Sequence, residues 1–173
     1  RTGTGELRTL RLEDGTLLSL DTHTAVDIDY EGEQRVIVLH QGEISVETGH
    51  DDPRPLWVRT DDGRLRPLGT RFLVKRETAG TRLEVLQAQV AAQPRNTGNE
   101  EVLNEGQQVL MHSNGLGLIG PVSAGADAWT RGMLVVDNVR LADLVAELGR
   151  YRSGHLGVSD EVANLRVTGS FPL

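Results

Sequence analysis

The N-terminal part of the chain alternates short apolar runs with turn residues, as β proteins do. In residues 25–30, Val26, Ile28 and Tyr30 alternate with mainly acidic residues, which predicts a strand with one buried and one wet face. Turn signals such as Asp14-Gly15 recur roughly every eight to twelve residues up to residue 92. Further strands are predicted at residues 4–12, 16–20, 35–39, 41–47, 56–60, 82–86, 102–103 and 107–111, and on both sides of Gly69-Thr70. This spacing indicates an all-β sandwich or solenoid.

Part of this pattern occurs twice. Six positions recur 48 residues later: Asp14-Gly15, Leu17, Leu20, Thr22 and Val26 reappear as Asp62-Gly63, Leu65, Leu68, Thr70 and Val74. The continuation recurs 47 residues later: Arg35, Val38 and Leu39 reappear as Arg82, Val85 and Leu86. Identical spacing over so many positions indicates a duplicated β unit, in which each copy lays its strands beside those of the last.

The pattern changes after Trp129. Residues 132–136 predict a strand, and Asp137-Asn138 provides a helix-start signal, because a short polar side chain can accept from the free N–H groups of a first turn. A helix ending near Tyr151 is predicted by apolar residues at i, i+3, i+4 and i+7, namely Leu141, Leu144, Val145 and Leu148. Short strands are expected at residues 156–158 and 165–169. The tail is therefore predicted to be a β-α-β unit.

These elements predict a mainly β fold with two domains. Residues 1–112 would form a duplicated antiparallel or solenoid-like β-sandwich, and residues 129–173 a small α+β domain. Residues 113–128 are loose and rich in glycine, so we expect a linker there.

Composition and charge narrow the function classes. Aromatic residues make up 3% of the 173 residues, so the core must be aliphatic, and the absence of cysteine excludes disulfides, thiolate metal sites and cysteine nucleophiles. The sequence has no initiator Met, signal sequence or apolar run that could span a membrane, so we expect an excised piece of a longer protein. The net charge is −7, and residues 1–60 carry twelve acidic groups against six arginines. An acidic chain with few aromatic residues is poorly suited to nucleic acid, and none is expected as a partner.

Polar clusters give little sign of a metal or cofactor. None of the five histidines has a second histidine at ligand spacing, and His50-Asp51-Asp52 precedes Pro53 in what we predict to be a solvated turn. The glycine-rich residues 115–120 resemble a phosphate-binding loop, but no capped helix follows and Pro121 interrupts them. We therefore expect no metal site and no cofactor.

The Gly69-Thr70 peptide is the candidate for covalent chemistry. A Thr hydroxyl can attack the preceding carbonyl when the backbone is strained, which converts the amide to an ester that water can open. Gly69 on the upstream side removes steric hindrance. The same dipeptide also occurs at Gly3-Thr4, Gly15-Thr16 and Gly80-Thr81, so the pair alone means little. The structural alternative is a bend with Thr70 packed inside the sheet.

Several ordered motifs together resemble the FecR family. They are Glu6-Leu7-Arg8, Leu12-Glu13-Asp14-Gly15-Thr16, the segment from Arg35 to Glu43, Pro55-Leu56-Trp57-Val58 and Leu68-Gly69-Thr70-Arg71-Phe72. The tail from Ala128 to Gly169 is similar to the C-terminal segment of that family, and to half of a secretin and TonB short domain. The resemblance covers nearly the whole chain.

The resemblance implies a periplasmic sensor domain of an anti-sigma regulator in iron and siderophore signalling. Its partner would be the N-terminal signalling domain of a TonB-dependent outer-membrane receptor. The sigma factor would be reached only through a cytoplasmic segment beyond one membrane helix, neither of which this sequence contains. Several members of the family cleave themselves at the Gly-Thr that corresponds to Gly69 and Thr70.

We expect the small domain to contact the partner through its strand edges, which could extend a sheet of the receptor domain. The candidate partner-binding residues are Leu134, Val135, Val136, Leu156, Gly157, Val158 and Trp129. Trp129, at the domain junction, is either an interdomain anchor or a buried strut. The apolar stripe of the helix is expected to form the core of the small domain.

Two positions depart from the family pattern. Ala88 stands where the second β unit should have a glycine like Gly42, so we expect that turn to be rearranged. The chain ends at Leu173 after one β-α-β set, so we expect the small domain to be incomplete and to expose an unpaired edge. Two other functions stay open, a β-solenoid scaffold whose repeats stack and a secreted carbohydrate-active domain with two facing carboxylates.

Overall fold

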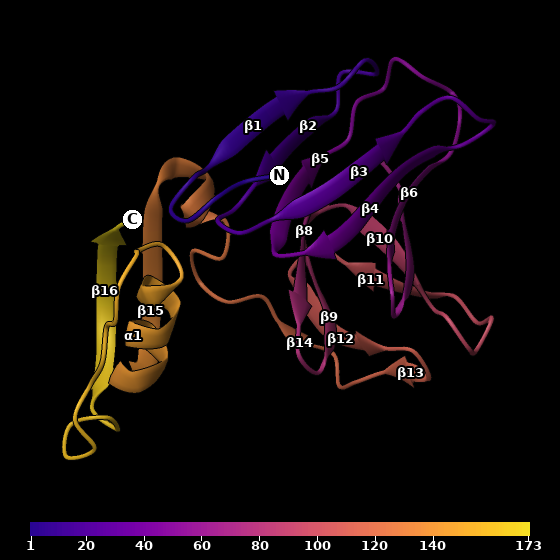
Figure 1. Cartoon of the computed structure of the whole chain (residues 1–173). Helices are drawn as coiled ribbons and strands as arrows, with labels where there is room; N and C mark the ends of the chain where they lie inside the picture. Colours follow the sequence, from indigo (N-terminus) through magenta and orange to yellow (C-terminus); the bar gives the residue numbers. More distant parts are fainter.

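The computed structural model describes residues 1–173 and contains a large β-sandwich followed by a small C-terminal unit (Figure 1). Sheet A of the sandwich contains, in spatial order, β1 (Arg8–Arg11), β2 (Leu17–Leu20), β5 (Glu43–Glu47), β8 (Arg71–Glu77), β9 (Gly80–Gln87), β12 (Gln107–His112) and β13 (Gly115–Leu116). Sheet B contains β11 (Glu101–Asn104), β10 (Gln89–Pro94), β7 (Gly63–Pro67), β6 (Leu56–Thr60), β4 (Arg35–Gln41) and β3 (Ala25–Asp29). Neighbouring strands are antiparallel except β4 and β6, which are parallel. The predicted mainly β fold is confirmed.

The core lies between the two sheets. Eighteen buried apolar side chains form one cluster, and Phe72 is its only aromatic member. Leu65 of sheet B and Leu83 of sheet A, both 0% exposed, belong to it. None of the eighteen lies beyond Met111 in the chain. The hydrophobic stabilisation of the molecule is therefore concentrated in the sandwich.

The duplicated unit has the same strand pairings in both copies, but the two sheets are exchanged. In the first copy β2 pairs with β5 in sheet A, and β3 pairs with β4 in sheet B. In the second copy β7 pairs with β10 in sheet B, and β8 pairs with β9 in sheet A. Each copy therefore crosses from one sheet to the other twice, first at residues 21–24 or 68–70 and again at Gly42 or Ala88.

The expected rearrangement at Ala88 does not occur. Gly42 has φ +86° between β4 and β5, and Ala88 has φ +60° between β9 and β10. Both residues thus lie in the left-handed region, which a glycine occupies easily and an alanine occupies at a cost. The need to switch sheets at this point overrides the preference of the alanine side chain.

The C-terminal unit consists of η1 (Ala128–Arg131), β15 (Met133–Arg140), α1 (Leu141–Gly149) and β16 (Arg166–Pro172). β15 and β16 form a two-stranded antiparallel sheet. The expected helix start at Asp137-Asn138 is wrong, because both residues lie in β15 at a break in its register, where Asn138 has φ +52°. The helix begins only at Leu141, and its N-cap residue, Arg140, makes no side-chain capping bond.

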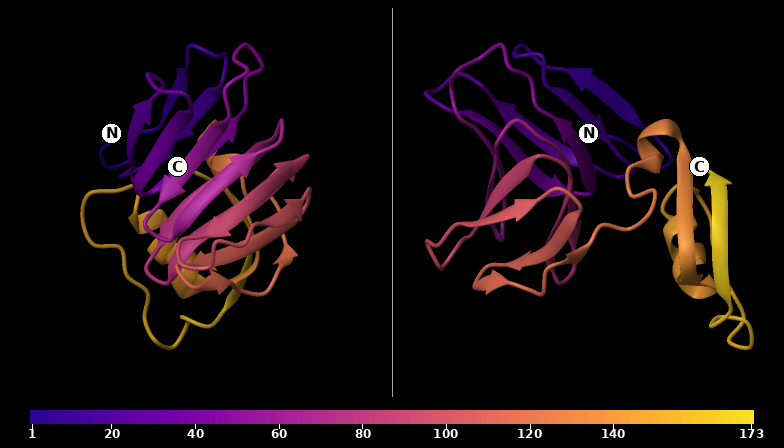
Figure 2. Two further views of the ribbon diagram at one scale, coloured as in Figure 1. Left: turned by 90° about the vertical axis from the view of Figure 1, so that its right-hand side faces the viewer. Right: turned by 180° about the vertical axis from the view of Figure 1, so that it is seen from behind.

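Two further expectations about the tail need correction. Residues 156–158 form no strand, so the β-α-β pattern has only two strands, separated by a long loop after α1. Part of the predicted linker belongs to the sandwich, because β13 and β14 (Gly120–Pro121) both pair with β12. The right-hand view of Figure 2 shows β16 (yellow) on the outside of the molecule, with β15 between it and the sandwich. No helix has the length and apolar character needed to cross a membrane.

Candidate functional site

Gly69 and Thr70 lie on the first sheet crossing of the second copy, between β7 in sheet B and β8 in sheet A. Gly69 is exposed and has φ +71°, whereas Thr70 is 3% exposed. Thr48 holds the Thr70 backbone on both sides: its Oγ1 accepts from the Thr70 N–H at 2.8 Å, and its N–H donates to the Thr70 carbonyl at 3.0 Å. The Gly69-Thr70 peptide is therefore held by hydrogen bonds on its Thr70 side and exposed to solvent on its Gly69 side.

The Thr70 hydroxyl is buried and has no hydrogen-bond partner. The hydroxyls of the three other Gly-Thr pairs are all engaged. Thr4 lies 3.0 Å from His23 Nε2, Thr16 donates to Asp14 at 2.8 Å, and Thr81 donates to Asp62 at 2.8 Å. Because buried polar groups are normally paired, the Thr70 hydroxyl stands out from its counterparts. The structure thus separates four dipeptides that the sequence could not rank.

A polar cavity of about 310 Å³ borders Gly69. The ring of His50 also lines it, with Cε1 3.8 Å from the position a Cβ would take at Gly69. Attack of Thr70 Oγ1 on the Gly69 carbonyl carbon would give an ester and move the hydroxyl proton to the Thr70 nitrogen. Water from the cavity could then open the ester to the Gly69 carboxylate and restore the hydroxyl.

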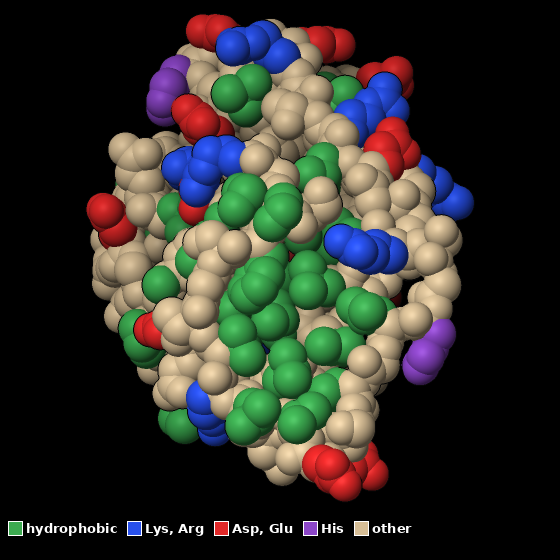
Figure 3. Space-filling view, turned by 90° about the vertical axis from the view of Figure 1, so that its left-hand side faces the viewer, with side chains coloured by type: hydrophobic (Ala, Val, Ile, Leu, Met, Phe, Trp, Pro, Cys, Tyr) green, Lys and Arg blue, Asp and Glu red, His purple; other side chains and the backbone are tan.

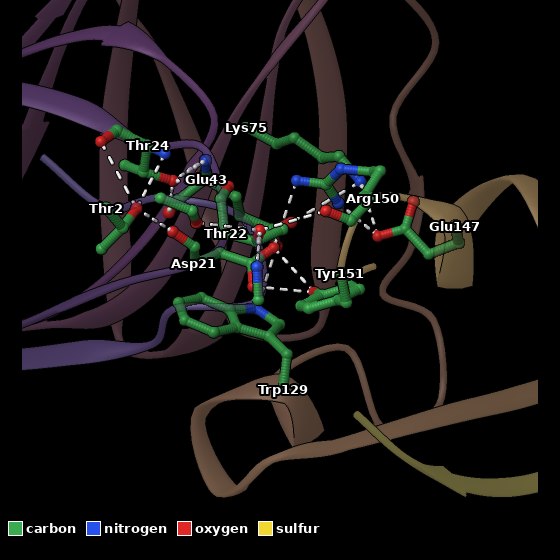
Figure 4. A network of polar contacts seen from close by, with 12 residues as sticks. Thr2, Asp21, Thr22, Thr24, Glu43, Lys75, Trp129, Glu147, Arg150 and Tyr151 are labelled. Carbon is green, nitrogen blue, oxygen red and sulfur yellow. Dashed lines mark hydrogen bonds and ion pairs between the residues drawn. The ribbon is translucent and has the colours of Figure 1, made fainter. Parts of the chain in front are cut away.

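A second polar cluster joins the C-terminal unit to the end of sheet A (Figure 4). Tyr151, the second residue after α1, points its hydroxyl at the carboxylate of Asp21, with distances of 2.7 and 2.8 Å to the two oxygens. Arg150 reaches the same carboxylate at 3.2 Å and also pairs with Glu147. Asp21 is 0% exposed, and burial raises its pKa although the contacts with Tyr151, Thr22 and Arg150 lower it.

Glu43 is the second buried carboxylate of this junction. Its Oε1 accepts from Trp129 Nε1 at 3.1 Å, and its Oε2 lies 3.6 Å from Lys75 Nζ. Burial raises the pKa of Glu43 to about 7, and Lys75 offsets this only partly. Trp129 is 5% exposed, so it is a buried side chain that also anchors the C-terminal unit to β5. Trp129 is therefore both an interdomain anchor and a buried strut, the two roles that the sequence left open.

Glycine allows the C-terminal unit to approach closely at two points. A Cβ at Gly5 would lie 2.6 Å from the carbonyl oxygen of Tyr151, and one at Gly125 would lie 2.5 Å from Cβ of Val135. Both glycines have positive φ, so a side chain there would be strained as well as crowded. The salt bridge from Arg71 to Asp127, at 2.5 Å, adds a further contact between β8 and the segment before η1.

The candidate partner-binding residues do not come together. Val135 and Val136 line a cavity of about 500 Å³ between the C-terminal unit and the sandwich, with Lys75 on the opposite wall. Leu134 pairs with Phe171 in the two-stranded sheet. Leu156, Gly157 and Val158 lie in the loop after α1, so they offer no strand edge. The outward edge of the small sheet belongs to β16 (Figure 1), which the sequence predicted as a strand at residues 165–169 but not as a binding edge.

The C-terminal unit leaves much of its apolar surface uncovered. Leu144 is the only buried residue of α1, and none in β15 or β16 is buried. In the following loop Leu156, Val162 and Leu165 are 43%, 37% and 57% exposed. Figure 3 looks at the molecule from the side of this unit and shows apolar side chains gathered in the middle, with charged groups mostly around the rim. A contiguous exposed patch of this kind is typical of an interaction surface.

Sequence reasoning missed the groups that hold the junction. Asp21, Glu43, Arg150 and Tyr151 lie at the ends of elements, where polar residues usually face solvent. The repeat gave one signal, because Asp21 and Glu43 stand where the second copy has Gly69 and Gln89. An acidic residue in only one copy marks a contact that only that copy makes.

Comparison with known proteins identifies relatives of the whole fold. A family model described as FecR protein matches residues 1–91, more than half of the chain. Two crystal structures of a candidate anti-sigma factor from Parabacteroides distasonis ATCC 8503 have TM-scores of 0.79 and 0.75, at 21% and 20% sequence identity. Each match covers 99% of this chain and 82% of the solved chain, which shows a shared fold. No curated protein matches the sequence.

Proposed function

The chain belongs to the FecR protein family, and we propose from that premise that it is the periplasmic sensor domain of an anti-sigma regulator. In this role it binds the N-terminal signalling domain of a TonB-dependent outer-membrane receptor. Occupancy of the receptor then reaches a sigma factor through segments of the regulator outside this chain. The fold shared with a candidate anti-sigma factor supports the regulatory part of the proposal. In this proposal the domain acts by binding a partner and not by catalysing the turnover of a substrate.

The uncovered apolar face of the C-terminal unit is the observation that supports receptor binding. The unit is held to the sandwich by Asp21 and Glu43, so binding does not have to fix its position first. Its outer strand, β16, has a free edge, and main-chain groups of such an edge can pair with a strand of another protein. The apolar patch would add burial to these bonds. Leu134, Val135 and Val136 remain candidate contact residues on the neighbouring strand β15.

Calorimetric titration with the N-terminal domain of the cognate receptor tests the proposal. Leu165→Asp places a charge at an apolar position that is 57% exposed, so it should weaken binding at least tenfold without unfolding the chain. Leu118→Asp is the matched control, because Leu118 is 98% exposed outside the C-terminal unit. Equal affinity of both variants would move the contact elsewhere. Absence of binding by the native chain, with concentration-dependent self-association, would favour the scaffold alternative.

We also propose that Gly69-Thr70 is a site of single-turnover self-cleavage. The unpaired Thr70 hydroxyl, the exposed Gly69 and the adjoining polar cavity support this proposal. Intact-mass analysis of the purified chain should show two fragments that separate before Thr70, and Thr70→Ala should give one mass. Thr81→Ala, at a Gly-Thr pair whose hydroxyl is engaged, should cleave as the native chain does. A single intact mass for the native chain would make Thr70 a structural residue.

A further inference from the structure

Arginines are concentrated on the outer face of sheet B, where Arg59 and Arg64 alternate with the core residues Val58 and Leu65. Arg59 on β6 stands directly opposite Arg64 on β7, and Arg64 stands opposite Gln93 on β10. Arg66 lies two positions after Arg64 on β7, so its side chain shares this face, and Arg95 directly follows Pro94, the last residue of β10. Adjacent strands are only about 4.8 Å apart, so the side chains of Arg59 and Arg64 leave the sheet close together.

Three of these arginines have no carboxylate partner. Arg66 pairs with Glu100 at 2.5 Å, but no salt bridge involves Arg59, Arg64 or Arg95. The nearest acids in the sequence, Asp61 and Asp62, are both paired with Arg76. Like charges directly opposite each other on a sheet destabilise it. In a chain with a net charge of −7, this face therefore carries a local excess of positive charge that the protein itself does not neutralise.

Arg64 is held in place for binding. Its guanidinium carbon lies 4.2 Å from the centre of the Trp57 ring, and its Nε donates to Gln93 Oε1 at 2.5 Å. Trp57 itself is 8% exposed, so it forms a firm base. These contacts use one face of the Arg64 guanidinium and its Nε–H, and they leave its two terminal nitrogens free. An arginine fixed in this way loses little conformational entropy when it takes up a ligand.

The three unpaired arginines surround one polar cavity of about 290 Å³, which is lined otherwise by Thr60, Gly63, Gln93 and Pro94. Its size lies near the lower end of the range for small-molecule sites. Planar guanidinium groups bind carboxylate and phosphate oxygens with paired hydrogen bonds, and three of them match the several oxygens of a phosphate group. We propose that this cavity, walled by Arg59, Arg64 and Arg95, is a binding site for a phosphate group.

Calorimetry at constant ionic strength tests this site directly. Inorganic phosphate should bind the native chain saturably, beyond the heat of an equal amount of potassium chloride, and Arg59→Gln should weaken the binding at least tenfold. Arg8→Gln is the control, because Arg8 is an exposed arginine without a salt bridge on the edge of sheet A. Equal phosphate affinity of both variants, or no phosphate heat above chloride, would overturn the proposal. If glucose 1-phosphate bound more tightly than phosphate, the ligand of this site would be a larger molecule that carries a phosphate group. If phosphate bound more tightly, the ligand would be the free ion.

Thermal unfolding gives a second measurement that does not depend on a heat signal. In chloride, Arg59→Gln should melt at a higher temperature than the native chain, because it relieves the repulsion between Arg59 and Arg64. Phosphate should raise the melting temperature of the native chain more than that of Arg59→Gln, since a ligand that binds only the folded state stabilises it. A melting temperature that phosphate raises equally in both proteins would place the bound phosphate elsewhere. Neither result depends on the receptor-binding surface.

Discussion

The first sheet crossings of the two copies have corresponding residues, but their threonine hydroxyls differ in hydrogen bonding. Leu20-Asp21-Thr22 in the first copy corresponds to Leu68-Gly69-Thr70 in the second. The Thr22 hydroxyl accepts from the Gly5 N–H at 2.8 Å and lies within 3.2 Å of the Gly3 and Arg150 carbonyls. The Thr70 hydroxyl has no partner.

The difference follows from what lies beside each crossing. The first crossing is covered by the N-terminal segment and by the end of α1, which give its polar groups partners. In the second copy glycine replaces the acid, the crossing faces a cavity, and no further segment supplies a partner. One crossing thus anchors the C-terminal unit, and the other leaves the Thr70 hydroxyl without a hydrogen-bond partner. This interpretation predicts that equivalent substitutions will have unequal effects.

The largest effect is expected from Asp21→Ala. The change leaves Tyr151 without its acceptor and Arg150 with only Glu147, and breaking a buried charge pair typically costs about 3 kcal/mol. Urea unfolding should show that loss, and amide exchange should show faster opening of α1 than of the sandwich. Asp27→Ala is the control, because the Asp27 side chain is 78% exposed. If Asp21→Ala lowered the free energy of unfolding no more than the control does, Asp21 would not be an anchor of the C-terminal unit.

The next effect depends on pH and concerns Glu43. Its pKa rises from 4.5 to about 7 in the folded protein because of burial. The folded state therefore holds this proton more tightly than the unfolded chain, and the stabilisation is full below pH 4.5 and lost as the pH rises through about 7. At about 1.4 kcal/mol per pH unit the loss is about 3 kcal/mol. The amide oxygen introduced by Glu43→Gln could still accept from Trp129, so this variant should unfold less readily than the native chain at pH 8.

Unfolding free energies measured from pH 4.5 to pH 8 check this prediction. The difference between Glu43→Gln and the native chain should grow from pH 4.5 to about pH 7 and level off toward pH 8. Glu47→Gln, an exposed position at the other end of β5, should give a constant difference. A constant difference for Glu43→Gln as well would mean that the folded protein does not retain the Glu43 proton.

The two threonines themselves give a smaller contrast. Thr22→Ala removes a hydroxyl with several partners and leaves the Gly5 N–H unpaired, which should cost about 2 kcal/mol. Thr70→Ala removes a hydroxyl without a partner, so it should cost less than about 1 kcal/mol while it abolishes cleavage. Denaturant midpoints of an uncleaved preparation measure both. Equal costs would show that Thr70 also has a stabilising contact, contrary to the difference between the crossings.

The sequence predicted the strands, the duplication and the aliphatic core, because period-two burial and Asp-Gly turns are local signals. It could not show that the two copies exchange sheets, since that depends on pairing between distant strands such as β5 and β8. The helix start failed at Asp137-Asn138 because β15 continues through a bulge with its partner β16. The strand expected at residues 156–158 failed because these residues pair with no strand and lie in the loop after α1.

The candidate sites show the same difference between local sequence signals, which could be predicted, and contacts between distant residues, which could not. The Gly69-Thr70 peptide was visible as a dipeptide, but its distinction from three others depends on the partners of their hydroxyls, which fold-level contacts decide. Trp129 was recognisable as a junction residue, whereas its acceptor Glu43 lies 86 positions earlier in the chain. The partner-binding role of Leu134, Val135 and Val136 stays a prediction, with β16 as the more exposed edge.

The smallest expected effect concerns the second sheet crossing of each copy. Ala88 holds φ +60°, so Ala88→Gly should stabilise the protein by about 1 kcal/mol, because glycine reaches the left-handed region without a steric penalty. The reciprocal change, Gly42→Ala, should destabilise by more, since its Cβ would lie 2.2 Å from Thr24 Oγ1. Thermal unfolding of both variants tests whether the two crossings share one backbone conformation. If Ala88→Gly melted at a lower temperature than the native chain, the two crossings would differ in backbone conformation, and the equivalence of the two copies would end at β9.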